Sequence, residues 1–430
     1  MKTKLFSFVG IGAYKLCAYE WGKKYSKETL FAQVALTELL QLSGVDLDEV
    51  VIFATEAAKE KYEILLGEEL ELFKPKVDYR FVSLADKVTA DKIWEFFDEI
   101  YKEIDDEDCI FFDITHGFRS FPLAVVPILQ YARELKRIEI GGIFYGNYEA
   151  RWEEGNKKVA PMDDLSDLLS FLDWSYGINT FLSTGNAQKL VELAGKEDLR
   201  RTKLSGQPSF QSKDMAQTLQ NFNRYSETCR APLLIDQAQN VKNTLSEAIQ
   251  NLSNYQTPLA NLFNKLEHKM SVFVGDPIAD PFYSIKWCID HGLTQQAYTM
   301  LFEHVITTIC LLLDANAKDF DTREAVRGGI AVTISKKPEE EWIFNGDDAK
   351  ELMMQTKSIL ESFDGLIANM QSLRKFRNDI NHAGFNKEPS KVGTIEKEIE
   401  ELALNLEPFF QHAQEVLGHQ KQKLQAKGGE

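Results

Sequence analysis

Short apolar runs alternate with helix-like segments over roughly the first 145 residues of this chain, and this alternation constrains the fold more than any single motif. Such alternation indicates repeated βα units, in which strands of a mainly parallel sheet are joined by crossover helices. The runs that we expect to form strands are Lys4–Gly10, Val50–Ala54, Val77–Val82, Cys109–Asp113 and Ile138–Phe144. The first part of the chain is therefore predicted to be an α/β domain.

The pattern changes after this region. Tyr148–Trp152 and Val159-Ala160 flank Glu154-Gly155-Asn156, which predicts a hairpin that closes the first domain. From Asp163 onward the periodicity is helical, and only Ile330–Ile334 suggests a strand, so we expect an all-α second part. The clearest predicted helices are Trp287–Leu313, Ala349–Ser362, Leu366–Asn381 and Val392–Leu417, with a loop at Lys196–Ser212 and a frayed end at Gln420–Glu430.

Composition excludes several classes of protein. The 49 basic and 66 acidic residues give a net charge of −17, which repels nucleic acid over most of the surface and restricts any polynucleotide contact to a local site. The 5 cysteines lack Cys-x-x-Cys spacing, so we expect neither a disulfide framework nor a zinc site. The most apolar late segment, Val305–Leu313, is far shorter than the ~20 residues of a membrane helix. A soluble, cytoplasmic protein is expected.

The segment Asp113–Arg119 is the strongest candidate for a ligand-binding loop. It lies between the apolar run Cys109–Phe112 and the helix-like stretch Pro122–Lys136, which predicts a strand, a polar loop and a helix. At such a junction the unpaired backbone N–H groups and the positive end of the helix dipole favour an anion such as a phosphate. In open α/β sheets, ligands bind at these strand ends.

The side chains of this loop fit a nucleotide better than a metal. Gly117 allows a ligand to approach the backbone, while Thr115, His116 and Arg119 supply a hydroxyl, an imidazole and a guanidinium. The alternative is a polar loop whose side chains only cap the helix.

The first predicted strand ends in a second candidate loop, Gly10–Lys15. It holds two glycines of the dinucleotide-binding fingerprint, but Lys15 replaces the third. Adjacent strands would bring this loop and Thr115–Arg119 to the same sheet edge, where Thr55-Glu56 and Tyr145–Asn147 would rim one phosphate-binding cleft. The alternative is that the glycines serve only a tight strand-to-helix turn.

Near the end of a predicted helix, Arg377 and His382 are separated by four residues, and Gly384 is expected to end the helix. On an ideal helix the two side chains are roughly 140° apart, so they converge only if the helix ends near His382 or the arginine swings round. In metal-free RNA cleavage, a histidine transfers a proton while a guanidinium stabilises the pentacoordinate phosphate. The alternative is an amphipathic helix with a solvated basic face.

No other constellation in the sequence points to chemistry as clearly. We expect His304, which lies in an apolar helical segment, to be a core or interface histidine. No set of histidine, aspartate and glutamate residues has metal-ligand spacing, and Walker, Gly-x-Ser-x-Gly and His-Glu-x-x-His motifs are missing from the sequence.

Taken together, these motifs resemble the CRISPR-associated accessory ribonucleases of type III systems, in which a Rossmann-like CARF domain precedes a helical HEPN domain. Gly10–Lys15 and Ile52–Ala58 are similar to the first two strand-end loops of that family. Asp113–Arg119 is similar to its strand-four loop, and Arg377 to His382 matches the HEPN Arg-x4-His motif. Residues 196–264 have no recognisable counterpart.

The resemblance implies a CARF domain at residues 1–162, a helical insertion at 163–280 and a HEPN ribonuclease domain at 281–430. Cyclic oligoadenylate, expected to be cyclic tetra-adenylate, would bind across a two-fold axis and activate cleavage of single-stranded RNA in a homodimer or higher even-numbered oligomer. The implied catalytic residues are Arg377, His382 and Asn378, and no metal, cofactor or membrane is implied. The implied ligand-binding residues are Gly10, Gly12, Ala13, Tyr14, Lys15, Thr55, Glu56, Thr115, His116, Gly117, Phe118, Arg119 and Asn147.

Two alternatives from other functional classes stay open at this point. One is a catalytically silent sensor of cyclic oligoadenylate whose helical part serves only dimerisation. The other is a nucleotide-dependent oxidoreductase that uses the Gly10–Lys15 loop. Whether the sensor domain also degrades its activator is not decided by the sequence.

Overall fold

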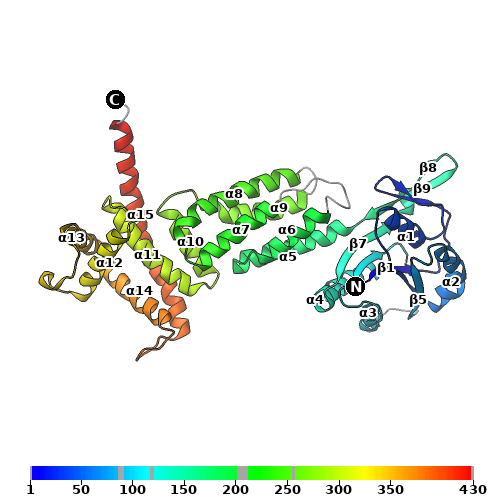
Figure 1. The fold of residues 1–430 in the computed structure, drawn as a ribbon, viewed down its shortest axis with the longest axis horizontal. Helices are drawn as coiled ribbons and strands as arrows, with labels where there is room; N and C mark the ends of the chain where they lie inside the picture. The colour runs from blue at the N-terminus through cyan, green and yellow to red at the C-terminus, as the bar shows by residue number, and fades with distance from the viewer. Residues whose placement is uncertain (1, 86–91, 117–120, 201–211, 254–256, 428–430) are drawn as a thin grey trace. The chain divides into compact units, whose positions relative to one another are not determined.

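The computed structural model describes residues 2–85, 92–116, 121–200, 212–253 and 257–427, and it forms two compact units (Figure 1). Within the described residues, the boundary between the units lies between Asp173 and Trp174. The first unit is an α/β domain with a mostly parallel sheet and the second is helical, so the predicted fold class is confirmed. The finer division at residues 162 and 280 stays a prediction.

Five strands of the first unit run parallel and have the spatial order β7-β6-β1-β4-β5. Their bounds are β1 (Thr3–Val9), β4 (Glu49–Thr55), β5 (Asp78–Leu84), β6 (Cys109–Asp113) and β7 (Glu139–Gly146). The chain builds outward from β1 through β4 to β5, then returns to the other side of β1 with β6. The carboxyl ends of β1 and β6 therefore flank the topological switch point, where open α/β sheets bind ligands.

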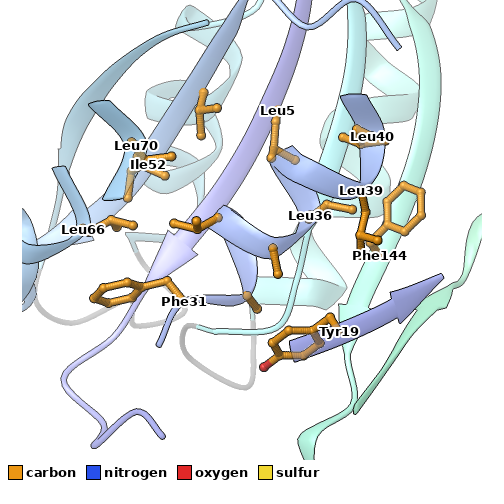
Figure 2. Close-up of a cluster of buried hydrophobic side chains, with 14 of the residues drawn as sticks. Leu5, Tyr19, Phe31, Leu36, Leu39, Leu40, Ile52, Leu66, Leu70 and Phe144 are labelled. Atoms are coloured by element: carbon orange, nitrogen blue, oxygen red, sulfur yellow. The ribbon is translucent and has the colours of Figure 1, made fainter. Parts of the chain in front are cut away.

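Helices cover both faces of the sheet, as the nearly continuous apolar character of its strands requires. The helices are α1 (Ala32–Leu42), α2 (Glu56–Glu71), α3 (Ile93–Lys102) and α4 (Phe121–Lys136). Figure 2 shows the core on the α1 and α2 side, where Leu5 and Ile52 of the strands meet Leu36 and Leu66 of the helices. Successive strand residues face opposite sides, so Phe6 packs in the second core with α3 and α4.

The segment between β1 and α1 differs from the prediction. Two short strands, β2 (Ala18–Trp21) and β3 (Lys24–Tyr25), precede the helix, and β2 pairs in parallel with β9 (Lys157–Asp164). The Gly10–Lys15 segment therefore does not turn directly into a helix, so the strand-to-helix turn that both interpretations of its glycines assumed is not formed. Strands this short become stable only by pairing with a partner that lies far away in the sequence.

The predicted hairpin is confirmed in its second half. β8 (Trp152–Glu154) pairs antiparallel with β9, and Gly155 occupies the turn with a φ of 63°. Tyr148–Ala150 forms a 3-10 turn instead of a strand, because the side chain of Asn147 accepts a hydrogen bond from the Ala150 N–H.

In the second unit, α11 is the central helix of the carboxyl-terminal bundle and packs against α10, α12, α14 and α15. The helices from the boundary to the carboxyl terminus are α5 (Ser166–Thr184), α6 (Gln188–Arg200), α7 (Ser212–Glu227), α8 (Ala231–Ser253), α9 (Thr257–Met270), α10 (Ala279–Asp290), α11 (Thr294–Leu312), α12 (Phe320–Ser335), α13 (Asp347–Ser362), α14 (Leu366–Asn381) and α15 (Val392–Lys427), with a 3-10 turn at η4 (Glu339–Glu341). Among the described residues, no helix is long and apolar enough to cross a membrane.

The predictions for α13 and α14 are confirmed, whereas four others in this unit need correction. The helix expected at Trp287–Leu313 is interrupted at Gly292, which has a φ of 70°. The segment at Gln420 remains helical as far as Lys427, and Lys196 belongs to α6. Residues 201–211 of the predicted Lys196–Ser212 loop lie outside the described residues.

The apolar segment Ile330–Ile334 is helical rather than extended, because it lies within α12 and packs against α13. Gly329 makes this packing close, since a Cβ there would lie 2.9 Å from the Met353 carbonyl oxygen. Tertiary contact thus outweighs the strand preference of a short β-branched run.

His304 is a core residue, as predicted, and it makes the stability of the second unit dependent on pH. Its side chain is 4% exposed, its ring centroid lies 4.4 Å from that of Phe410, and burial lowers the pKa of His304 to about 3. The Ile278 backbone and the Asp276 carboxylate act in the opposite direction but are outweighed. Because the unfolded chain binds the proton near pH 6.5, stability is present above that pH and is lost as the pH falls toward 3.

We expect His304→Leu to reduce the loss of unfolding free energy between about pH 7 and pH 5 by about 2 kcal/mol relative to the unmodified chain. Urea unfolding of the helical unit at both pH values measures this difference. His419→Leu, at an exposed position of α15, is the control and should leave the pH dependence unchanged. Equal pH dependence in the two variants would contradict the assignment.

Candidate functional site

A buried carboxylate organises the switch point of the sheet. Asp113 is the last residue of β6 and lies opposite Ser7 of β1 in the parallel pairing. The Ser7 hydroxyl donates to Asp113 Oδ2 at 2.6 Å, and the Thr115 backbone N–H donates to Asp113 Oδ1 at 2.9 Å. The Thr115 hydroxyl donates to the same Oδ1 atom. Asp113 therefore joins two strands to the loop that follows β6.

Thr115 extends this network to the next strand. Its hydroxyl oxygen accepts a hydrogen bond of 2.7 Å from the backbone N–H of Gly146, at the end of β7. Glycine is required at that position, because a Cβ would lie 2.8 Å from the Tyr19 ring and 3.2 Å from the Thr115 methyl group. Strands β1, β6 and β7 are thus connected through three side chains, those of Ser7, Asp113 and Thr115.

The loop after β1 closes against the same place through Tyr14. The Tyr14 hydroxyl accepts a hydrogen bond from the Gly10 N–H at 2.8 Å and donates one to the Gly10 carbonyl oxygen at 2.9 Å. Burial raises the pKa of Tyr14 to about 12, so the hydroxyl keeps its proton near neutral pH. The Tyr14 ring lies 4.4 Å from the His116 ring and 4.8 Å from the Tyr62 ring, measured between centroids. The two predicted loops therefore meet.

Helix α2 holds the outer part of the β1 loop. Lys61 donates to the Ile11 carbonyl oxygen at 2.8 Å, and the Tyr62 hydroxyl donates to the Gly12 carbonyl oxygen. Two carbonyl groups of the loop are bound by α2, and the side chains of Ala13 and Lys15 are exposed to solvent. Sequence reasoning missed the contribution of Lys61 and Tyr62, which lie on a helix whose own pattern carried no sign of a site.

The imidazole ring of His116 has a buried nitrogen atom without a hydrogen-bond partner among the described residues. Burial lowers the pKa of His116 although the Asp113 carboxylate acts in the opposite direction, so the imidazole is neutral at pH 7. Its Nε2 atom is buried and has no hydrogen-bond partner among the described residues. A neutral imidazole nitrogen can donate to or accept from a ligand, depending on its tautomer. Gly117, Phe118 and Arg119 lie outside the described residues.

Three predicted rim residues have local roles as well. Thr55 caps α2, with its side chain accepting a hydrogen bond from the Ala58 N–H at 3.3 Å, and Glu56 is exposed in the first turn. Asn147 donates to Asp163 Oδ2 at 2.9 Å. They lie at the carboxyl edge of the sheet, as predicted.

In the second unit, Arg377 belongs to an ion-pair cluster that the sequence did not reveal. Its Nη2 atom is 4.0 Å from Glu303 Oε1, and its guanidinium lies 4.7 Å from the centroid of the Phe302 ring. Arg323 and Arg327 contact the same Glu303 carboxylate at 2.8 Å and 3.0 Å. The cluster joins residues from α11, α12 and α14, which are separated by up to 74 positions in the sequence (377 − 303).

His382 caps the carboxyl end of α14, so the helix ends where convergence with Arg377 requires it to end. Its side chain is exposed, as is that of Asn378. Within the part of the chain that the structure describes, no hydrogen bond or ion pair joins the ring of His382 to Arg377. One chain therefore supplies the two groups without bringing them into contact.

Among the described residues, no group of three or more histidine, cysteine, aspartate or glutamate side chains could hold a metal ion. The available chemistry consists of hydroxyl, imidazole and backbone donors at the sheet edge, and guanidinium and imidazole groups in the helical unit.

Comparison with known proteins identifies the α/β unit. Residues 4–149 match the family model of the CRISPR system endoribonuclease Csx1, CARF domain. This unit is therefore similar to the CARF domains of type III CRISPR accessory proteins. The switch-point site described above lies within the region that matches a CARF domain.

The region after the CARF domain has a match of its own. Residues 170–274 match the second domain of the CRISPR-associated protein MJ1674. The curated protein of that name from Methanocaldococcus jannaschii is 27% identical over 247 residues, which are 56% of this chain and 35% of that protein. The match thus spans about a third of the length of the relative.

We expect Thr115→Val to destabilise the CARF domain by about 1–3 kcal/mol, because it removes one of the three hydrogen bonds to the buried Asp113 carboxylate and leaves the Gly146 N–H without its Thr115 acceptor. Thr115→Ser keeps the hydroxyl and should stay within about 1 kcal/mol of the unmodified chain. Chemical unfolding of both variants measures the difference. A larger loss in Thr115→Ser than in Thr115→Val would show that the methyl group, not the hydrogen-bond network, is what matters.

Proposed function

We propose that this protein is a metal-independent endoribonuclease of type III CRISPR antiviral defence, activated by cyclic oligoadenylate, that cuts single-stranded RNA. One observation carries the proposal. The loops after β1 and β6 converge at the switch point of a CARF domain, in a chain whose α14 ends with an Arg-x4-His motif. The activator that fits best is cyclic tetra-adenylate, and no cofactor is needed for the chemistry.

The geometry of the sensor edge supports a phosphate ligand. The loop of residues 10–15 exposes Lys15 to solvent. The ring of Tyr14, in the same loop, contacts the ring of His116, whose Nε2 atom has no hydrogen-bond partner among the described residues. A compact tetra-anion needs one local pocket rather than a basic surface, so the net charge of −17 is compatible with binding. A ring with two-fold symmetry suits an isologous dimer, in which each copy offers the same loops to half of the ligand.

The chemistry requires one proton acceptor, one proton donor and one cation. The ribose 2′-oxygen attacks the adjacent phosphorus while its proton passes to a base, and the bond from phosphorus to the 5′-oxygen breaks as that oxygen receives a proton. His382 would transfer the proton, and Arg377 would stabilise the charge on the pentacoordinate phosphate. Asn378, exposed on the same turn as Arg377, would position the phosphate. The products are a 2′,3′-cyclic phosphate and a free 5′-hydroxyl.

Two copies of the chain would complete this site. His382 is exposed at a helix end, while Arg377 is half-buried against Phe302 and Glu303. A second α14 packed beside the first would bring two Arg377 guanidinium groups and two His382 rings into one cleft. Arg377 and His382 therefore need not meet within one chain. Activator binding at the CARF domains would then control how the two helical units face each other.

The two alternatives fare differently. The oxidoreductase alternative loses its basis, because residues 10–15 lead to β2 instead of entering a helix whose amino terminus could hold a pyrophosphate. The silent sensor remains a distinct hypothesis, since it requires the same CARF site but no cleavage. Slow degradation of the activator by the CARF domain is compatible with both.

The decisive experiment is to incubate the full-length protein with labelled single-stranded RNA and EDTA, with and without cyclic tetra-adenylate or cyclic hexa-adenylate. We expect cleavage only when cyclic tetra-adenylate is present, because the active site is assembled by the ligand and uses no metal. Cleavage with the hexa-adenylate alone would change the assigned ring. Ligand binding without any cleavage would support the silent sensor.

Two variants should separate sensing from cleavage. His382→Ala is expected to lower the cleavage rate at least a hundredfold, in line with the usual contribution of a general acid-base group, and to leave activator affinity unchanged. Arg119→Ala is expected to weaken activator binding about tenfold or more, because a charge-assisted hydrogen bond to phosphate is lost.

His419→Ala and Arg137→Ala are the matched controls for these variants. His419 is exposed on α15, and Arg137 is exposed just before β7, at the opposite edge of the sheet from the ligand. Both controls should behave like the unmodified chain in a gel cleavage assay and in calorimetric titration with cyclic tetra-adenylate. The reverse pattern of effects in the two test variants would refute both assignments.

A further inference from the structure

A pocket of about 820 Å³ lies in the second unit beside the cluster around Glu303. Its walls come from α11, α12, α13 and α14 and from the loop before α13, and its volume falls within the range of about 300–1,000 Å³ that is typical of small-ligand sites. Arg377 and Asn378, the groups proposed to handle the reacting phosphate, form part of its wall. The pocket therefore begins where the proposed chemistry takes place.

The polar wall of the pocket carries guanidinium groups, some of whose donors have no partner among the described residues. Arg327, Arg374 and Arg377 line it. The Nε atoms of Arg327 and Arg377 are buried and have no hydrogen-bond partner among the described residues. A buried donor without a partner is costly, so two of them at one wall indicate an acceptor that arrives with a ligand. Arg374 is exposed, which leaves its cation accessible from the pocket mouth.

The apolar wall exposes flat and branched side chains to water. Phe320 at the start of α12 is 72% exposed, and Ile343 and Phe344 in the loop before α13 are 89% and 38% exposed. Apolar side chains gathered at a pocket mouth are a usual sign of a binding site. Aromatic faces next to cations are the combination by which proteins hold single-stranded nucleic acid, since every base has a face that stacks.

Two carboxylates limit where a phosphate can lie. Asp321 and Glu324 line the α12 side of the pocket, and Glu324 is ion-paired with Arg327. A phosphate is therefore favoured on the α14 side, near Arg374 and Arg377. This arrangement separates a basic end, next to the proposed reacting phosphate, from an apolar end that suits a base.

We propose that this pocket holds a nucleotide of the single-stranded RNA next to the cleaved bond, with its base against Phe320 and Phe344 and its phosphate at Arg374. The inference rests on the proposed function in taking RNA as the substrate. The pocket adds the contact that lets a chain with a net charge of −17 hold a polyanion locally. Binding through stacking and phosphate contacts predicts little selectivity among bases.

The test measures binding separately from cleavage. A short fluorescein-labelled single-stranded RNA with a 2′-O-methyl group on every ribose cannot be cut by attack of the 2′-oxygen, so its affinity can be measured by fluorescence anisotropy on the full-length protein with cyclic tetra-adenylate present. Phe344→Ala and Arg374→Ala should each weaken binding about tenfold. Lowering the salt concentration should strengthen binding to the unmodified chain, and by a smaller factor in Arg374→Ala.

The matched controls are Leu404→Ala and Lys375→Ala. Leu404 is 63% exposed on α15, and Lys375 is the exposed residue next to Arg374, and neither lines the pocket. Both controls should bind the RNA like the unmodified chain. Unchanged affinity in Phe344→Ala and Arg374→Ala would overturn the inference. So would a loss of the dimer in these variants on sedimentation, because the pocket would then be a contact between copies.

The failure of this inference can be told apart from the failure of the proposed function. If the unmodified protein cuts unmodified RNA and the pocket variants bind the blocked RNA normally, only the pocket assignment falls. If the blocked RNA binds in a pocket-dependent manner but unmodified RNA is never cut, the pocket assignment stands and the nuclease is refuted.

Discussion

The CARF domain depends on one buried carboxylate. Asp113 is fully buried and receives hydrogen bonds from Ser7 and from two donors of Thr115, and Thr115 in turn binds the end of β7. A buried charge without such donors would cost several kcal/mol, so the network is a condition for the strand ends to lie as they do. The loops after β1 and β6, which we propose bind the ligand, start from these strand ends. Sheet stability and the geometry of these loops therefore rest on the same few atoms.

The helical unit has a comparable centre in Glu303. Three arginines from two other helices converge on this carboxylate, in a chain whose overall charge is strongly negative. Glu324 also pairs with Arg327, so three guanidinium groups and two carboxylates leave one excess positive charge in a half-buried place, where solvent screens it less than at the surface. An acidic protein can in this way keep positive charge at one place without a basic surface. The two centres thus differ in charge balance, because hydrogen-bond donors satisfy the carboxylate of Asp113 whereas guanidinium groups outnumber the carboxylates around Glu303.

Much of the fold was predictable, because buried parallel strands and long amphipathic helices leave a periodic signal. The five central strands and α14, with Arg377 within it and His382 at its end, follow from that signal. Two of the failures have a common cause. Strands β2 and β3 are too short for a pattern and exist through pairing with β9, and the helical state of Ile330–Ile334 is decided by packing against α13. Local propensity is weak, and long-range contacts override it.

The sequence alone determined which residue types stand at the ends of strands and helices, and therefore that Gly10–Lys15 and Thr115–His116 lie at one edge of the sheet. Only the tertiary structure decided how these groups are held. Tyr14 closes one loop against His116, Lys61 and Tyr62 hold the loop from another helix, and Glu303 gathers its arginines. The periodicity of apolar residues predicts which face of each segment is buried in the core and which is exposed to solvent. It does not report which distant segments meet each other, and that choice is made by packing and by the pairing of buried charges.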